Sequence, residues 1–220
     1  MRLRAQDFLS LMNAISGFSA TISAHLGLRD ISVLMLIAAV LFDGADGIVA
    51  RRSEQSELGP HLDSLADMVS FGVAPAAATF FIHSEPYILI ICALYMLCGM
   101  LRLARYNISP AEWTHFEGLP ITAAGLILGV SLLLDSLPLT SFLMIILSAL
   151  MVSTVPYPKL RDPRLVPLSL MVGAVALSAL YTSGVKASAV VILIPMAFYL
   201  MMPVVRCCTL RERLQHSRQG

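Results

Sequence analysis

Four aspartates lie where two apolar runs meet, between residues 43 and 67, in a stretch that reads DGADGIVARRSEQSELGPHLDSLAD. Asp43 and Asp46 are three residues apart, and Asp63 and Asp67 are four apart, so each pair shares one face of a helix. A charged side chain within hydrocarbon costs roughly 2.5–3.5 kcal/mol on insertion scales. No lysine lies within either apolar run, so another positive charge must stabilise the four carboxylates.

The composition of the whole chain is that of a membrane protein. Of its 220 residues, 57% are apolar and only 13% are charged, and the mean hydropathy is +0.80. A soluble domain usually carries about 25% charged residues, so most of this surface must face lipid. The net charge of +1 argues against nucleic acid as a partner, because nucleic-acid binding requires a strongly basic face.

Apolar runs of about 20 residues, the length of a transmembrane helix, recur along the chain. They predict an all-α integral membrane protein with about eight transmembrane helices, folded as a single catalytic domain over residues 1–220. Prolines and glycines lie at most of the boundaries. The predicted spans are 8–27, 31–51, 60–82, 86–107, 118–135, 138–156, 165–183 and 187–206.

The distribution of lysine and arginine predicts the orientation of these spans. With eight spans, thirteen of the fifteen cations fall on one side of the membrane, and only Arg29 and Lys186 fall on the other. Cytoplasmic loops carry the excess of positive charge. We therefore expect a protein of the cytoplasmic membrane. Both termini and the loop between the two acidic spans should lie on its cytoplasmic side.

The acidic spans predict a metal site near the cytoplasmic face. A short loop joins them, so they should pack antiparallel and bring their acidic faces together. Four carboxylates converging on one point suit a hard divalent cation, with Mg²⁺ or Mn²⁺ favoured when phosphate completes the coordination shell. Gly47 lies one turn after Asp43, and Gly59 lies one turn before Asp63; such small residues leave room for a ligand or simply allow close helix packing.

The spacing of these residues resembles the signature of the CDP-alcohol phosphotransferase family. All eight specified positions of that signature are present. The resemblance implies two divalent ions held by the four aspartates, with Asp67 serving both as ligand and as general base. It also implies a six-helix core, commonly dimeric, and contacts of the CDP moiety with Gly47, Ala50, Arg51, Ser56 and Gly59.

The chemistry that this family performs is a phosphoryl transfer. The hydroxyl of an acceptor alcohol attacks the phosphorus that carries the lipid, and CMP leaves. The CDP-lipid would be CDP-diacylglycerol or, in an archaeal relative, the ether-linked CDP-archaeol; the apolar spans do not distinguish between them.

Further matches resemble the phosphatidylserine synthase branch of the family and suggest L-serine as acceptor. They cover roughly the first 125 residues and include the run from Asp63 to Pro75 and the segments at 102–107 and 116–120. Arginine suits a carboxylate, and the candidates for binding serine are Arg102, Arg105, Asn107 and Asn13. One departure is Gln6-Asp7, where that branch usually has a Pro-Asn pair.

The sequence leaves open the acceptor alcohol, the class of protein and the role of one glycine motif. Glycerol 3-phosphate or inositol phosphate could be the acceptor, although a phosphate should require a denser basic pocket. A cation transporter is the alternative from another class, because intramembrane carboxylates also line transport paths. Finally, Gly125 and Gly129 form a Gly-x-x-x-Gly motif, which would serve either a dimer interface or packing within one chain.

Overall fold

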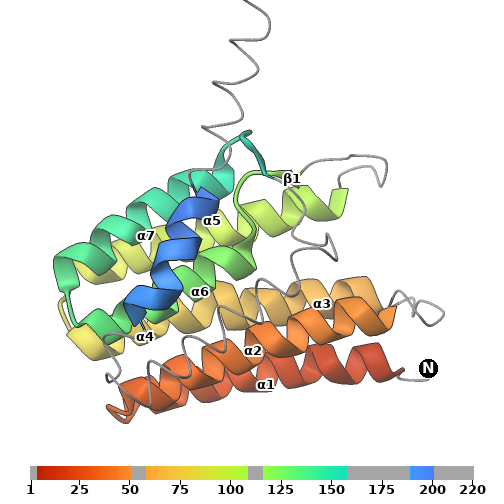
Figure 1. Ribbon diagram of the computed structural model, residues 1–220, viewed down its shortest axis with the longest axis horizontal. Coiled ribbons are helices and arrows are strands. Elements are labelled where there is room, and N and C mark those ends of the chain that lie inside the picture. Colours follow the sequence, from red (N-terminus) through yellow and green to blue (C-terminus); the bar gives the residue numbers. More distant parts are fainter. Residues whose placement is uncertain (1–3, 51–57, 109–115, 158–188, 201–220) are drawn as a thin grey trace, which may run out of the picture.

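The computed structural model describes residues 4–50, 58–108, 116–157 and 189–200, and these residues are almost entirely helical (Figure 1). Helices α3, η1 and α4 follow one another directly as one rod whose middle portion, η1, is a π-helix. The short strands β1 and β2 form one antiparallel pair. The elements are α1 (Ala5–His25), α2 (Arg29–Ala50), α3 (Gly59–Asp67), η1 (Met68–Val73), α4 (Ala74–His83), α5 (Ile88–Ile108), β1 (Phe116–Glu117), α6 (Ile121–Ser131), η2 (Leu132–Leu134), α7 (Leu137–Val152), β2 (Pro156–Tyr157) and the helix Ala189–Leu200.

Three helical segments in this part of the chain are long and apolar enough to cross a membrane: Arg29–Val49, Gly59–His83 and Ile88–Ile108. Shorter apolar helices cover Ile121–Leu134, Leu137–Val152 and Ala189–Leu200. The first six predicted spans each coincide with a helix or a continuous helical rod, with ends that differ by a few residues. The predicted span 165–183 lies outside the described residues, and the helix Ala189–Leu200 falls inside the predicted span 187–206.

Helix α1 organises the acidic half of the molecule. It turns back into α2 through Gly27, which has a φ of +76° that glycine adopts without strain. It also lies against α3, η1 and α4. Contacts from successive turns of α1 reach successive positions from Gly59 to Ser70, so α1 and the α3–α4 rod run parallel while α2 runs antiparallel to both (Figure 1).

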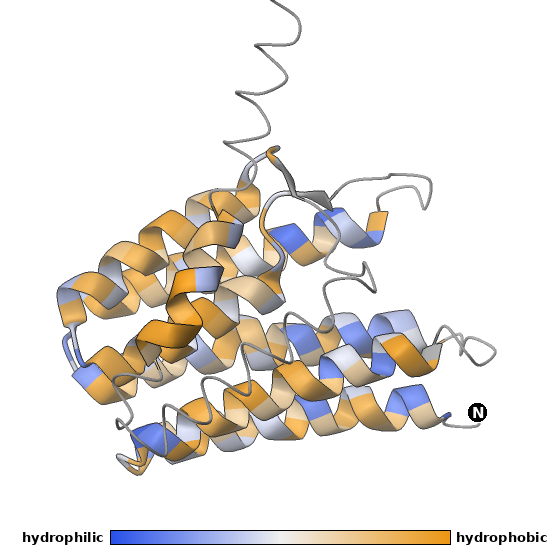
Figure 2. Ribbon diagram, in the orientation of Figure 1, coloured by the Kyte–Doolittle hydropathy of each residue, from blue (hydrophilic) through white to orange (hydrophobic). Residues whose placement is uncertain are grey.

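The apolar core lies between η1, α5, α6 and α7. Its largest fully buried side chains include Phe71, Tyr95, Ile121, Leu128 and Met144. Helix α6 is apolar on all sides, as expected of a helix surrounded by others, and it contrasts with the polar right-hand ends of α1, α2 and α3 in Figure 2.

Close approaches of glycine explain how α6 fits into this core. A Cβ on Gly125 would lie 2.7 Å from the Cβ of Phe71, and one on Gly129 would lie 2.6 Å from a methyl group of Leu36. Both glycines of the Gly-x-x-x-Gly motif therefore serve packing within the chain, which is one of the two functions that the sequence left open.

Candidate metal centre and active site

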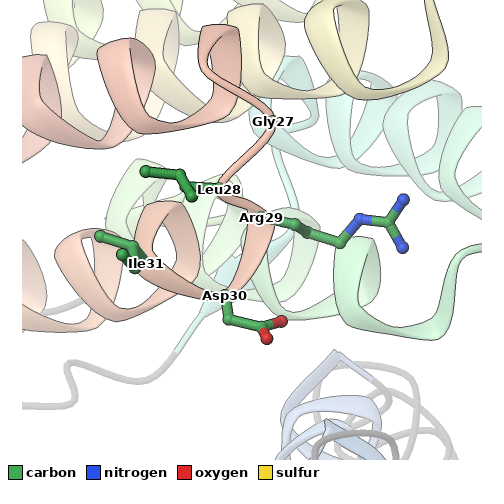
Figure 3. Close-up of a pocket in the computed structure, with 5 residues that line it drawn as sticks. All are labelled: Gly27, Leu28, Arg29, Asp30 and Ile31. Atoms are coloured by element: carbon green, nitrogen blue, oxygen red, sulfur yellow. The ribbon is translucent and has the colours of Figure 1, made fainter.

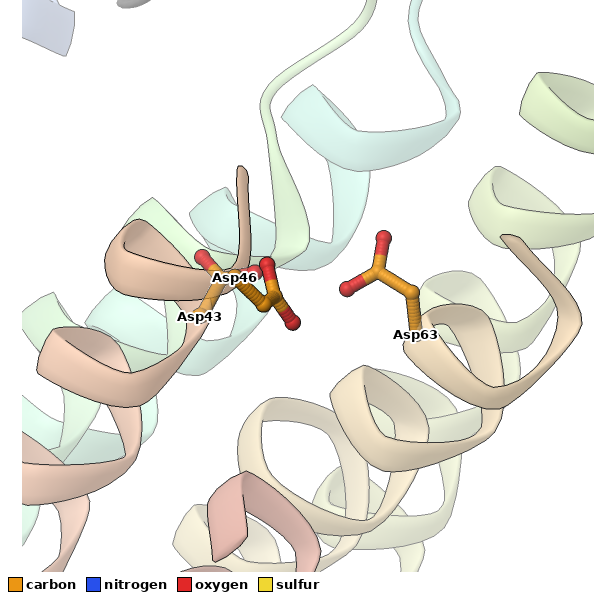
Figure 4. Close-up of side chains that lie close together, drawn as sticks. All are labelled: Asp43, Asp46 and Asp63. Carbon is orange, nitrogen blue, oxygen red and sulfur yellow. The ribbon is translucent and has the colours of Figure 1, made fainter. Parts of the chain in front are cut away.

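Three of the four aspartates meet at one point between α2 and α3. Ligand oxygens of Asp43, Asp46 and Asp63 all lie within 4.8 Å of one another, and Figure 4 shows the side chains pointing into the same space from the two helices. Asp46 is buried, whereas the other two are partly exposed. The predicted convergence of the two acidic faces is confirmed for these three residues.

Asp67 lies outside this group of three, one turn further along α3 from Asp63. Its side chain is 7% exposed, and its Oδ1 accepts a hydrogen bond of 3.2 Å from Nδ2 of Asn13. It remains within electrostatic range of Asp43, Asp63 and Arg102. Asp67 is therefore a neighbour of the cluster with a separate environment, and its hydrogen bond from Asn13 connects it to α1.

Helix α1 supplies a polar wall that the acidic motif alone does not reveal. Ser10 donates a hydrogen bond of 3.0 Å to Oδ2 of Asp46, and the backbone carbonyl of Asn13 accepts one of 2.8 Å from Ser70. Sequence reasoning identified Asn13 but missed Ser10. The available signal was their spacing, because residues three apart share one helix face.

The first turn of α1 is also buried against α3. A Cβ on Gly59 would lie 2.7 Å from Nε2 of Gln6 and 3.5 Å from Oδ1 of Asp7. Gly59 thus lets α3 approach the Gln6-Asp7 pair. Asp7 additionally caps α1, since its Oδ2 accepts a hydrogen bond of 2.9 Å from the backbone N–H of Arg4.

Gly47 has a different environment from Gly59. A Cβ on Gly47 would meet no other heavy atom within 4 Å among the residues that the structure describes. Packing against the described residues therefore does not require a glycine here, and the room on this side suits a ligand that approaches the backbone of α2. Ala50 is the last residue of α2, while Arg51 and Ser56 lie outside the described residues.

The candidate serine-binding residues on α5 have distinct surroundings. Arg102 is only 8% exposed, packs its guanidinium 5.4 Å from the centre of the Tyr106 ring and lies within electrostatic range of Asp67 and Asp43. Arg105 donates a hydrogen bond of 3.0 Å to the carbonyl of Val152 at the end of α7. Asn107 is exposed and accepts a hydrogen bond from Ser64 on α3.

A hollow lies at the turn between α1 and α2 (Figure 3). It is lined by Gly27, Leu28, Arg29, Asp30 and Ile31. Arg29 forms a 2.8 Å ion pair with Asp135. Asp43 lies fourteen positions along α2 from Arg29, about 20 Å at ~1.5 Å per residue, so this hollow belongs to the opposite end of the bundle.

The negative charge and the oxygen ligands of the acidic cluster fit a divalent cation. Carboxylate oxygens from two helices converge, and oxygen is the ligand atom that hard divalent cations prefer. Ser10, as a hydrogen-bond donor to Asp46, is the kind of outer partner that orients a metal ligand. These features, set among helices apolar enough to cross a membrane, make the cluster a candidate site for a divalent cation.

The chain belongs to the CDP-alcohol phosphatidyltransferase family, whose model matches residues 5–157. It is 36% identical over 160 residues to the archaetidylserine synthase of Methanothermobacter thermautotrophicus, covering 70% of this chain and 69% of that protein. It is 39% identical over 155 residues to the CDP-diacylglycerol–serine O-phosphatidyltransferase of Methanocaldococcus jannaschii, with coverages of 70% and 73%. A Bacillus subtilis protein of the same name is 38% identical over 138 residues, with coverages of 59% and 76%.

Proposed function

We propose that this protein transfers the phosphatidyl or archaetidyl group of a CDP-lipid to the hydroxyl of L-serine and releases CMP. The observation that carries the proposal is the convergence of Asp43, Asp46 and Asp63 inside the segment that matches the family. The choice of serine is supported by the names of the similar proteins, which are serine phosphatidyltransferases and an archaetidylserine synthase.

The aspartates have two roles in this proposal. Asp43, Asp46 and Asp63 hold the divalent cation, Mg²⁺ or Mn²⁺, and Asp67 completes the site for a second ion. When bound there, the cation would supply positive charge that offsets the pyrophosphate and stabilises the departing CMP. Asp67 accepts the proton of the serine hydroxyl, and the hydrogen bond from Asn13 supports this role because it fixes the orientation of the carboxylate.

The basic residues of α5 are proposed to recognise the serine. Arg102 is the best placed, because it is buried beside the acidic cluster and a guanidinium binds carboxylate in a two-pronged manner. Asn13 and Asn107 would supply polar contacts. Arg105 has a weaker claim, since one of its donors is occupied by the Val152 carbonyl.

The donor substrate is proposed to lie along α2 and the start of α3. The open space beside Gly47 supports an approach of the CDP moiety to the backbone there, with Ala50, Arg51, Ser56 and Gly59 as further contacts. The lipid tails, ester- or ether-linked, would remain in the bilayer. The proposed architecture is a homodimer in which each subunit has eight spans, six of them forming the core. Both termini lie in the cytoplasm, and the site lies towards the cytoplasm.

The first experiment is a measurement of CMP release by the detergent-purified protein. CDP-diacylglycerol and CDP-archaeol would each be supplied with Mn²⁺ or Mg²⁺ and with L-serine, glycerol 3-phosphate or inositol phosphate in turn. We expect metal-dependent release with serine alone. Release with another alcohol would refute the serine assignment and keep the chemistry, whereas no release with any acceptor would favour cation transport.

A further inference from the structure

The π-helix η1 begins at the residue that follows Asp67 and ends at Val73. Short π-helical insertions in α-helices frequently occur at functional sites. The backbone N–H of Ala74 bonds to the carbonyl of Val69, five residues earlier, as a π-helix requires. The backbone that carries the proposed base therefore passes directly into an irregular turn.

Pro75 gives this irregularity a local cause. In a regular α-helix the carbonyl of Phe71 would accept a hydrogen bond from the N–H of residue 75. Proline has no N–H, and its ring clashes with the carbonyl four residues earlier. The carbonyl of Phe71 thus loses its ordinary helical donor in a fully buried environment, where an unsatisfied carbonyl is costly.

Tyr95 of α5 supplies a donor to that carbonyl. Its hydroxyl donates a hydrogen bond of 3.0 Å to the carbonyl oxygen of Phe71, and its side chain is 0% exposed. A buried tyrosine hydroxyl usually needs a polar partner. Here the tyrosine and the proline-deprived carbonyl satisfy one another, and they connect α5 to the turn that follows Asp67.

Two further helices, α1 and α6, contact the same turn. Ser70 donates to the carbonyl of Asn13, and a Cβ on Gly17 would lie 2.5 Å from Cα of Ser70, so α1 is in close contact with η1. On the other side, Gly125 of α6 packs closely against Phe71. With Ser70 and Phe71 held in place, the winding of η1 determines where the carboxylate of Asp67 stands relative to the amide of Asn13.

We propose that Tyr95 is a positioning residue for Asp67: by bonding the Phe71 carbonyl that Pro75 leaves without its helical donor, it fixes the π-helical turn on which the base depends. This inference rests on the proposed function, because it assigns Tyr95 a role in placing the proposed base. Tyr95 does not contact the reacting groups and acts only through the backbone of η1.

The decisive variant is Tyr95→Phe, which removes the hydroxyl and keeps the ring. Because small misplacements of a catalytic group lower turnover steeply, we expect kcat to fall by about 10- to 100-fold, with little change in KM for the CDP-lipid or in the metal concentration required. The matched control is Ser148→Ala, which removes another buried hydroxyl that bonds a carbonyl, that of Met144 on α7. A merely structural Tyr95 would lower the Tm and leave kcat of the folded protein within about twofold of wild type, like the control.

A second variant tests the cause assigned to Pro75. Pro75→Ala restores an N–H opposite the Phe71 carbonyl, so the tyrosine hydroxyl becomes redundant. In that background, Tyr95→Phe should change kcat by no more than about twofold. An equal loss in both backgrounds would overturn the link between Pro75, Phe71 and Tyr95.

Hydrogen exchange separates this inference from the proposed function. Amides of residues 68–74 and 76 should exchange faster in Tyr95→Phe than in wild type, whatever alcohol the enzyme uses. If wild type releases no CMP with any acceptor, the proposed function fails and Tyr95 has no base to position. Unchanged exchange in the variant refutes the inference even when wild type is active with serine.

Discussion

The end of the bundle that holds Asp43, Asp46 and Asp63 differs sharply from the end that holds Arg29 and Asp135. At the first end, carboxylates crowd together from two helices. At the second end, one acid and one base form a half-exposed ion pair. Like charges held together destabilise a fold unless a ligand compensates them, whereas an exposed ion pair contributes little in either direction. The carboxylate cluster therefore indicates function. The ion pair only links the start of α2 to the turn before α7.

The largest expected effect comes from Asp67→Asn. The variant keeps the size of the side chain and removes the proposed base, so we expect the rate of CMP release to fall by about 10²- to 10⁴-fold. The matched control is Asp135→Asn at the opposite end, which should keep wild-type activity. Equal losses in both variants would remove the functional difference between the two ends, and full activity of Asp67→Asn would end its assignment as base.

Ser10→Ala should weaken the metal site without removing a ligand. Its hydroxyl bonds Asp46, and loss of such an outer partner typically lowers metal affinity by about 10- to 100-fold. Titration of activity with Mn²⁺ should therefore shift to higher concentration, while excess metal restores most of the rate. Ser16→Ala is the control on the same helix, because the Ser16 hydroxyl bonds the carbonyl of Met12 within α1 itself. A rate that stays low at saturating metal would contradict the assignment.

Gly125 and Gly47 differ in packing, and substitution by alanine should show the difference. Gly125→Ala would push a Cβ into the backbone of Phe71, so we expect a loss of about 1–3 kcal/mol in the free energy of unfolding. In Gly47→Ala the new Cβ meets no heavy atom within 4 Å in the described part of the chain, so the variant should raise helix stability by about 0.5–1 kcal/mol, while activity falls because the CDP moiety loses room. Thermal unfolding and CMP release should be measured on both variants. For Gly47→Ala we expect a higher Tm and a lower rate of CMP release.

Much of this architecture follows from the sequence because it depends on simple periodicities. Hydrophobic length predicted helices at the first six expected spans, and the i, i+3 spacing of Asp43 and Asp46 predicted their shared face. The separation of Asp67 from the other three acids was not predictable, because it depends on which neighbour each turn of α3 meets. Ser10 was missed for the same reason: its spacing of three from Asn13 places both on one face of α1, but only tertiary packing shows that this face meets the cluster.

The π-helix shows the same limit in the backbone. Pro75 predicts a disturbed hydrogen bond at Phe71, but it does not predict whether the helix kinks or widens. That outcome depends on Tyr95 of α5, Gly125 of α6 and Gly17 of α1, which meet η1 only in the folded chain. Long-range partners therefore decided the local geometry next to the proposed base.

The smallest expected effect is that of Asp135→Asn on stability. Arg29 and Asp135 are 30% and 51% exposed, and an ion pair of that kind contributes only about 0–1 kcal/mol. Asp135 also has a φ of +54°, a conformation that asparagine tolerates as well as aspartate does. The free energy of unfolding in detergent should therefore change by less than about 1 kcal/mol, and added salt should reduce the difference further. A larger loss would mean that this end of the bundle carries electrostatic strain of its own, and the contrast with the acidic end would then rest on the cluster of carboxylates alone.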